Sequence, residues 1–576
     1  MKRFYSSLNL AAQDINQETV NTDTTVADLE TVDNATCGVY YSGGTYRIEL
    51  YKDVDNQDNL SFEKNTKLNL NEHKVTFAEK NGIVFNSSFT IQNGTLNNVA
   101  SPEFISTTSS NIDGVFKTEN IVINQEVPNT ITTNVFTINL KNKTAIVKNT
   151  TINQNGEGNA QYQVVGLRSL NDSKDGFIKT VNYTQTSNVK YAKYLVGIMS
   201  KSNIYDSKSV ITLICDEGLL FGLYFLNDIT TDDSKITISN STGAGMAVYG
   251  FETTGDAVIN NVTIDIKTNT AQVEGIRIPE SHNKLSVLNS HITISGQQCT
   301  SSPVGIVSGS ANTSITGCNV FVESQKANGT DGAGILFRNH SGSNQTTVIE
   351  NCEVYGKQWG IQTSQNGLTI IKKCNVSATD HSAYITGNAN IYNSNFFIAN
   401  RDKYTDVDTA YGLYCGAATE NIKAIVNFYD CTIGSADDLT KNTFNGIVSQ
   451  GHYTGRNYTP AEINLYNTDI YTTQRAFTYN IGADDIPIIT KFNLYGKTQI
   501  YVYNQNSKKF DTISKETLND EIMTWKTMVK EKESTGHSMY NRGIIFGNEV
   551  GVVDESTGSL KYIRVTDDAN VYDYRN

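Results

Sequence analysis

The chain has little of what marks several common protein classes. Of its 576 residues only six are proline and two are tryptophan, and no apolar run reaches the length of a membrane-spanning helix. Residues 1–7 include a lysine and an arginine, but no apolar core of the kind found in a secretory signal peptide follows them. We therefore expect no membrane insertion and no export through a standard signal.

Basic tracts and zinc-type clusters are also missing. The formal net charge is −13 at pH 7, which disfavours nucleic acid or an anionic membrane as the main partner. The eight cysteines include no Cys-x-x-Cys pair, and no His/Cys cluster has zinc spacing. We accordingly predict no metal site and no cofactor.

What the chain does have is a glycine followed by an apolar residue at recurring intervals. The mean interval is about 28 residues, and single intervals vary between about 23 and 34. A period in this range with variable length indicates a solenoid whose loops differ in size. The series includes Gly166-Leu167, Gly197-Ile198, Gly222-Leu223, Gly250-Phe251, Gly275-Ile276, Gly305-Ile306, Gly334-Ile335 and Gly360-Ile361.

The residues between these glycines have the pattern of short strands. Each repeat carries an Asn or Asp, a small residue, and a β-branched or aromatic residue two places on, as in 261–264 and 351–354. No apolar stripe with helical spacing lies between them. The sequence therefore predicts an all-β fold, a right-handed single-stranded parallel β-helix of about fourteen or more coils over residues 46–510.

The two ends depart from this pattern. We predict that residues 1–45 form an N-terminal attachment segment with a short helix, capped by Thr24 or Thr25 and running through Val26, Leu29 and Val32. Residues 511–576 are predicted to form a C-terminal helix and β-hairpin module that caps the solenoid and joins sister chains. The stripe on its helix consists of Leu518, Ile522, Trp525 and Val529.

Four cysteines occupy one slot of successive repeats. Cys318, Cys352, Cys374 and Cys431 stand where Ser290, Ser394 and Thr468 stand in other repeats. The slot thus requires a small side chain rather than sulfur chemistry, and free cysteine behaves as a small apolar residue. We predict four buried, reduced thiols.

One stretch points to a family. Residues 65–75, with Gly94-Thr95-Leu96 about twenty residues on, resemble the entry coils of pectin-lyase-fold right-handed β-helices, particularly those of bacteriophage tail spikes and virion appendages. The resemblance covers roughly 46–510 and does not decide activity, because this fold serves lyases, hydrolases, esterases and adhesins. It implies a virion protein made in the host cytoplasm. It also implies a homotrimer that is attached to other virion proteins through its N-terminal segment and that binds a bacterial surface glycan.

Candidate binding residues cluster near the ends of the glycine-bearing strands. The turn after each such strand should lie on one lateral face, so that its residues form a column. Aromatic rings there would stack on sugar faces, and arginine would bind hydroxyl or carboxylate oxygens. The predicted glycan column comprises Arg277, His282, Arg338, His340, Trp359 and Tyr453.

Catalysis would require two carboxylates about 5 to 10 Å apart. Glu274, Glu280 and Asp331 can be combined in this way, and the sequence permits equivalent sets from Asp216, Glu217, Glu252 and Asp256. The triplet 277–279 resembles the Arg-x-Pro element of pectate lyases, but their calcium-binding aspartate cluster has no counterpart here. The sequence leaves open whether the chain breaks any bond.

The expected function is that of a bacteriophage structural protein, a tail spike, tail fibre or appendage that binds a bacterial surface polysaccharide. One alternative is a polysaccharide depolymerase, either a glycosidase or a lyase, on the same scaffold. A second is a head fibre or capsid decoration protein without a specific ligand. A secreted bacterial adhesin is the third, and the missing export signal disfavours it.

Overall fold

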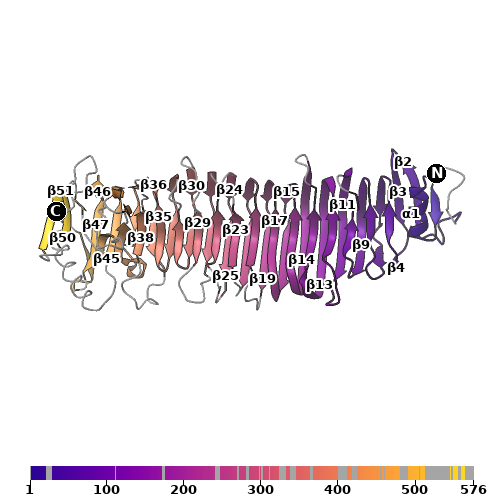
Figure 1. Ribbon diagram of the computed structural model, residues 1–576, viewed down its shortest axis with the longest axis horizontal. Coiled ribbons are helices and arrows are strands. Elements are labelled where there is room, and N and C mark those ends of the chain that lie inside the picture. The colour runs from indigo at the N-terminus through magenta and orange to yellow at the C-terminus, as the bar shows by residue number, and fades with distance from the viewer. Residues whose placement is uncertain are drawn as a thin grey trace. The chain divides into compact units, whose positions relative to one another are not determined.

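The structure is a computed structural model of the whole chain (Figure 1). It forms two compact units: residues 1–278 with 294–301, and residues 279–293 with 302–576. We call them unit 1 and unit 2. The residues that the structure describes are 2–20, 29–109, 112–171, 176–240, 247–268, 272–279, 284–296, 299, 302–309, 312–323, 332–337, 346–363, 367–399, 411–417, 424–449, 452–454, 457–459, 461–479, 491–504, 506–512, 545–546, 549–554 and 559–564.

Each unit consists of parallel strands stacked coil upon coil, which confirms the predicted all-β parallel solenoid. One stack contains the recurring glycines, and we call it the Gly ladder. In unit 1 it comprises β12 (Val135–Leu140), the C-terminal parts of β13 (Asn142–Ser169) and β14 (Phe177–Ser200), β17 (Glu217–Phe225), β20 (Ala247–Thr253) and β23 (Gln272–Ile278). The arrows labelled β14, β17 and β23 in Figure 1 belong to it.

The apolar residue after each glycine forms an inward row along this ladder. Leu167 is paired with Ile198, Ile198 with Leu223, and Leu223 with Phe251, and all four side chains are fully buried. The glycine is required because successive coils approach closely. A Cβ on Gly222 would lie 2.5 Å from the carbonyl oxygen of Gly250 and 2.5 Å from Ile236 Cγ2, and real Cβ atoms do not approach other atoms that closely.

Asparagines with a left-handed backbone form a recurring corner turn of the coils, and in the first coils this turn lies within the strands β9 (Phe89–Val99), β11 (Ile112–Glu126), β13 and β14. Asn93, Asn120, Asn149 and Asn182 all have positive φ, between 46° and 56°, a conformation that asparagine tolerates better than most residues. Their side chains form a ladder: the Nδ2 atoms of Asn120, Asn149 and Asn182 each donate to the Oδ1 atom of the preceding asparagine at 3.1, 2.9 and 2.8 Å. The turn therefore contributes hydrogen bonds along the stack as well as a change of direction.

The small residue after this turn lies inside the coil. Cys318, Cys352, Cys374 and Cys431 are buried, as predicted, and are free thiols. Each Sγ contacts the carbonyl oxygen two residues earlier, at 3.2 to 3.4 Å. Ser394 Oγ makes the same contact, with the Tyr392 carbonyl at 2.8 Å. Serine, threonine and cysteine can replace one another in this slot because each is small and carries one donor.

The N-terminal segment differs from its prediction. Its helix is α1 (Leu8–Asn16), capped by the Ser7 side chain, and not a helix through Leu29 and Val32. Leu29 forms a β-bridge with Phe4, and residues 30–34 are bends and turns. The spacing of Val26, Leu29 and Val32 is compatible with one helical turn, but pairing with the first strand overrides it. Thr24, Thr25 and Val26 lie outside the described residues.

Antiparallel strands begin and end the chain. β1 (Arg3–Tyr5) pairs with β2 (Cys37–Ser42), and β2 pairs with β3 (Thr45–Leu50). Near the C-terminus, β49 (Ile545–Phe546), β50 (Glu549–Asp554) and β51 (Ser559–Arg564) form an antiparallel sheet. The predicted helix with Leu518, Ile522, Trp525 and Val529 lies outside the described residues. Within the described part of the chain, no helix is long and apolar enough to cross a membrane.

Candidate functional site: a lateral groove on the Gly ladder

Two columns of side chains cover the outer face of the Gly ladder of unit 1. They come from the residues that flank each glycine-apolar pair: the apolar residue of the pair is buried in the core, and the flanking side chains form the outer face. The aromatic column consists of Phe136, Val165, Val196, Phe221 and Tyr249. The mixed column consists of Arg168, Met199, Tyr224, Glu252 and Arg277.

A groove with a volume of about 460 Å³ runs over the aromatic column from Val196 to Tyr249 and over the mixed column from Met199 to Arg277. Its floor is apolar: Val196, Phe221 and Tyr249 are only 3, 9 and 6% exposed although they point away from the core of the coil. We call the whole groove the lateral groove. Its lining comprises Gln163, Tyr194, Val196, Met199, Leu219, Phe221, Tyr224, Ala247, Tyr249, Glu252 and Arg277.

The aromatic rings of the groove contact one another at the distances of specific ring pairs. The Phe221 and Tyr249 rings are stacked with centroids 5.1 Å apart, and the Phe221 and Tyr224 rings are tilted with centroids 5.0 Å apart. Because such pairs fix ring orientation, the floor has a defined shape before any ligand binds.

One end of the groove is charged. Arg277 Nε lies 3.6 Å from Glu252 Oε1 and 3.5 Å from Glu274 Oε2. Arg277 Nη1 donates to Tyr249 Oη at 2.7 Å, and Gln272 Nε2 donates to Glu274 Oε1 at 2.8 Å. Arg277 is thus occupied by two carboxylates and a phenol of the same chain.

Burial changes the proton affinity of the tyrosines here. It raises the pKa of Tyr249 to about 12, and the neighbouring Glu252 and Glu274 raise it too, whereas Arg277 acts in the opposite direction. The pKa of Tyr224 is raised as well, first by burial and then by Glu252. Both hydroxyls therefore stay protonated at neutral pH and can donate hydrogen bonds.

The other end of the mixed column is formed by Arg168, one coil before Met199. Its guanidinium carbon lies 4.2 Å from the centre of the Phe136 ring. Burial lowers the pKa of Arg168, and Glu103 acts in the opposite direction. Among the described residues, no carboxylate forms an ion pair with Arg168, and its buried Nε has no hydrogen-bond partner.

The structure brings some of the predicted site residues together. Arg277 and Glu274 are in contact, and Glu252, one of the equivalent carboxylates in the sequence, joins them. Arg277 lies within strand β23 and not in the turn after it. Glu274 is only 2% exposed, so its carboxylate faces Arg277 and Gln272 rather than the open groove.

Trp359 belongs to unit 2. It begins strand β32 (Trp359–Gln362) and packs on Val304, Val307 and Ala333, with the Tyr384 ring 6.1 Å away. For Tyr453 the structure describes only the backbone, in β42 (His452–Thr454). The remaining predicted site residues lie outside the described part of the chain: Glu280, His282, Asp331, Arg338 and His340.

Sequence reasoning missed most of the groove, including Phe221, Tyr224 and Tyr249, and it also missed Arg168, the register partner of the lining residue Met199. A usable signal was present, because these residues stand directly before a glycine or directly after the apolar residue that follows it. The prediction placed the candidate residues in the turns, whereas strand residues line the groove. A strand residue whose side chain points out of the solenoid lies on the surface, even where the next residue of the strand points into the core.

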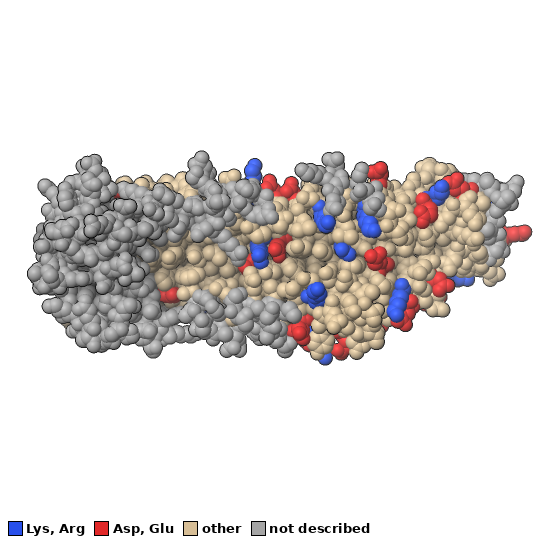
Figure 2. Space-filling view, viewed as in Figure 1, with Lys and Arg blue, Asp and Glu red and all other residues tan. Residues whose placement is uncertain are grey.

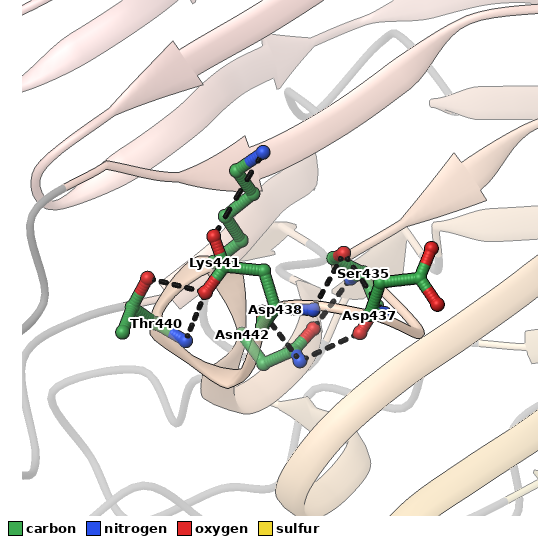
Figure 3. A network of polar contacts seen from close by, with 6 residues as sticks. All are labelled: Ser435, Asp437, Asp438, Thr440, Lys441 and Asn442. Carbon is green, nitrogen blue, oxygen red and sulfur yellow. Dashed lines mark hydrogen bonds and ion pairs between the residues drawn. The ribbon is translucent and has the colours of Figure 1, made fainter.

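Unit 2 contains a separate polar network in the loop after β40 (Thr432–Ile433). Asn442 Nδ2 donates to the Ser435 carbonyl at 2.8 Å, and Ser435 N donates to Asn442 Oδ1 at 2.6 Å (Figure 3). Asp438 caps the short 3₁₀ helix η2 (Leu439–Lys441) by accepting from Thr440 N at 3.0 Å. These contacts are internal to the loop, so we assign them a structural role.

Fold and groove together define the protein as a parallel β-helix with a preformed apolar and charged groove on an outer sheet face. The chain matches no protein-family model, no curated protein and no solved structure at the significance required of a relative.

Proposed function

We propose that this chain is a β-helical structural protein of a bacteriophage virion, a tail spike, tail fibre or appendage, that binds a bacterial surface polysaccharide in the lateral groove. The observation that carries the binding role is the apolar, aromatic floor next to charged side chains on an outer sheet face. The virion assignment, including the homotrimer and the attachment through residues 1–45, rests on the resemblance of residues 65–75 and 94–96 to phage appendages.

A glycan suits this groove for physical reasons. Sugar rings have apolar C–H faces that pack on aromatic and aliphatic side chains, while their hydroxyls exchange hydrogen bonds with phenols, amides and carboxylates. The groove supplies Phe221, Met199 and Leu219 for the first kind of contact, and Tyr224, Gln163 and Glu252 for the second. Because its side chains project from strands and not from loops, little ordering cost is incurred on binding.

The described surface on the face seen in Figure 2 is compatible with this role. Figure 2 shows that most of the described surface on the viewed face is uncharged, and that lysine, arginine, aspartate and glutamate are interspersed. Such a surface has no extended field of one sign that would favour nucleic acid.

The geometry favours binding over bond cleavage at this site. A glycosidase needs two carboxyl groups that both reach the scissile bond. Here Glu252 lines the groove, but Glu274 is buried against Arg277. We therefore propose a binder, and release of reducing ends from a bound polysaccharide would favour the depolymerase instead.

The test is a binding assay of the full-length chain against purified bacterial capsular polysaccharides and lipopolysaccharides. Tyr224→Ala should weaken binding at least tenfold, because aromatic anchors dominate such sites. The matched control is Tyr205→Ala: Tyr205 is 52% exposed on β15 (Asn203–Ser207), outside the groove. Binding that is equally strong in the wild type and Tyr224→Ala would refute the groove as the site.

A further inference from the structure

Two arginines of the mixed column differ in the carboxylates around them. Arg277 contacts Glu252, Glu274 and the Tyr249 hydroxyl. Arg168 has no such partners among the described residues, although it lies in the same column, three coils before Glu252. Both are partly buried, but Arg277 has two carboxylates in direct contact, whereas Arg168 has none among the described residues and only Glu103 favours its charged form from further away.

The position of Arg168 is fixed by its neighbours. Its guanidinium lies over the Phe136 ring, which orients the planar group and leaves its edge to make hydrogen bonds. The carboxylate that acts on the pKa of Arg168 is that of Glu103. Glu103 Oε1 instead accepts a hydrogen bond from Asn139 Nδ2 at 2.9 Å, and Asn139 is the register partner of Arg168 on the preceding coil.

A half-buried guanidinium without a counterion is a binding site for an anion. Arginine is weakly hydrated, and its fork matches a carboxylate with two parallel hydrogen bonds. Supplying that carboxylate from a ligand would offset the cost of burying the charge. The distance from Arg168 to Glu252 is three coil steps, or about 14 Å, so an oligosaccharide anchored at Arg168 would extend over Met199 and Tyr224.

We infer that the polysaccharide bound by the lateral groove is acidic, with the carboxylate of a uronic or sialic acid residue on Arg168. This inference rests on the proposed function and specifies its ligand class. Arg277 does not take the same role, because Glu252 and Glu274 already occupy it and would repel a second carboxylate. The groove therefore has a direction: the acidic sugar lies at the Arg168 end, and hydroxyl-rich sugars lie near Glu252.

The experiment measures binding of the full-length chain to polygalacturonate, alginate, hyaluronan and polysialic acid, each beside its carboxyl-reduced form, together with neutral dextran and mannan. Carboxyl reduction replaces each charge by a hydroxyl and keeps the backbone. We expect at least one acidic polymer to bind, and its reduced form to bind at least tenfold more weakly, as befits loss of a charge-assisted hydrogen bond.

Variants assign that preference to Arg168. Arg168→Met keeps the packing on Phe136 and should lower affinity for the acidic polymer to that of its reduced form, while Arg168→Lys should retain part of the preference. The matched control is Lys179→Met, which removes the same charge at an exposed position of β14 away from the groove. It should bind like the wild type.

The outcomes separate the two proposals. Equal binding of acidic and reduced forms, or an acidic preference that survives Arg168→Met, overturns the inference. Tyr224-dependent binding of a neutral polymer with none to any acidic one overturns the inference and leaves the proposed function standing. Binding to none of these polymers, nor to the bacterial polysaccharides above, overturns both. If Arg168→Met does not fold, the carboxyl reduction and Arg168→Lys decide the question.

Discussion

Arg277 holds Tyr249 in two ways at once: its Nη1 donates to the Tyr249 hydroxyl at 2.7 Å, and its guanidinium carbon lies 5.0 Å from the centre of the same ring. The two residues come from successive strands, β20 and β23. This contact connects the aromatic column to the charged end of the groove.

Tyr249→Phe should destabilise the protein by about 1 to 2 kcal/mol. The ring stacking on Phe221 is kept, but Arg277 loses an acceptor in a half-buried position, and hydrogen bonds to charged groups are worth more than neutral ones. Chemical denaturation of the variant measures the loss. Tyr205→Phe serves as the control because its ring is half exposed. Equal stability of Tyr249→Phe and the wild type would show that water replaces the hydroxyl.

Alkaline pH should remove the stability that the buried, protonated Tyr249 gives the fold, because burial disfavours the phenolate. The pKa of Tyr249 is raised from its ordinary value of 10.0 to about 12, so the folded chain holds the phenolic proton more tightly than the unfolded chain does. The resulting stability is present below pH 10 and is lost as pH rises towards 12. The difference in unfolding free energy between the wild type and Tyr249→Phe should therefore shrink across this interval. A constant difference from pH 8 to 12 would contradict the assignment.

The inward position of Cys352 should tolerate serine but not a charged residue. Cys352→Ser should stay within about 1 to 1.5 kcal/mol of the wild type, because Ser290 and Ser394 occupy the same slot with the same backbone contact. Cys352→Arg should prevent folding, since an unpaired buried charge costs several kcal/mol. Soluble expression and thermal melting distinguish the two variants, and a folded Cys352→Arg protein would refute an inward slot.

Burial inside the coils should also make the cysteine thiols slow to react with alkylating reagents. Burial raises the pKa of Cys215 and of Cys431 to about 11, and the thiolate is the reactive form. Maleimide labelling at pH 7 should thus be slow in the native protein and complete in denaturant. Rapid native labelling of Cys431 would show that its coil opens.

The asparagine ladder predicts that, at Asn149, alanine destabilises the protein more than glycine does. Asn149 has a φ of 46° and its amide bonds to Asn120 and Asn182. Asn149→Gly loses the two hydrogen bonds but tolerates the backbone, whereas Asn149→Ala also incurs about 1 kcal/mol or more for its left-handed conformation. Alanine should therefore be the less stable replacement. Urea denaturation of both variants measures the order, and a more stable alanine variant would contradict it.

The fold could be predicted from the sequence because its determinants are local and repeated. Gly222 and its equivalents mark close contacts between coils, and Cys352 and its equivalents mark a small inward slot, so each repeat tests the same assignment. The groove could not be predicted in the same way. Phe221, Tyr224 and Arg168 differ from coil to coil, and their proximity depends on register between strands about 25 to 30 residues apart. The N-terminal helix was misplaced because a single bridge between Leu29 and Phe4 outweighs local helical spacing.

The separation of inward and outward positions on the Gly ladder has an evolutionary consequence. Gly222 and Leu223 hold the coils together, while Phe221 and Tyr224 on either side of them face the groove. Substitutions at the outward pair change the groove and its ring packing, while the inward rows and the backbone pairing between coils stay in place. Point mutations can thus reshape the outer face of the Gly ladder separately from the rows that join its coils.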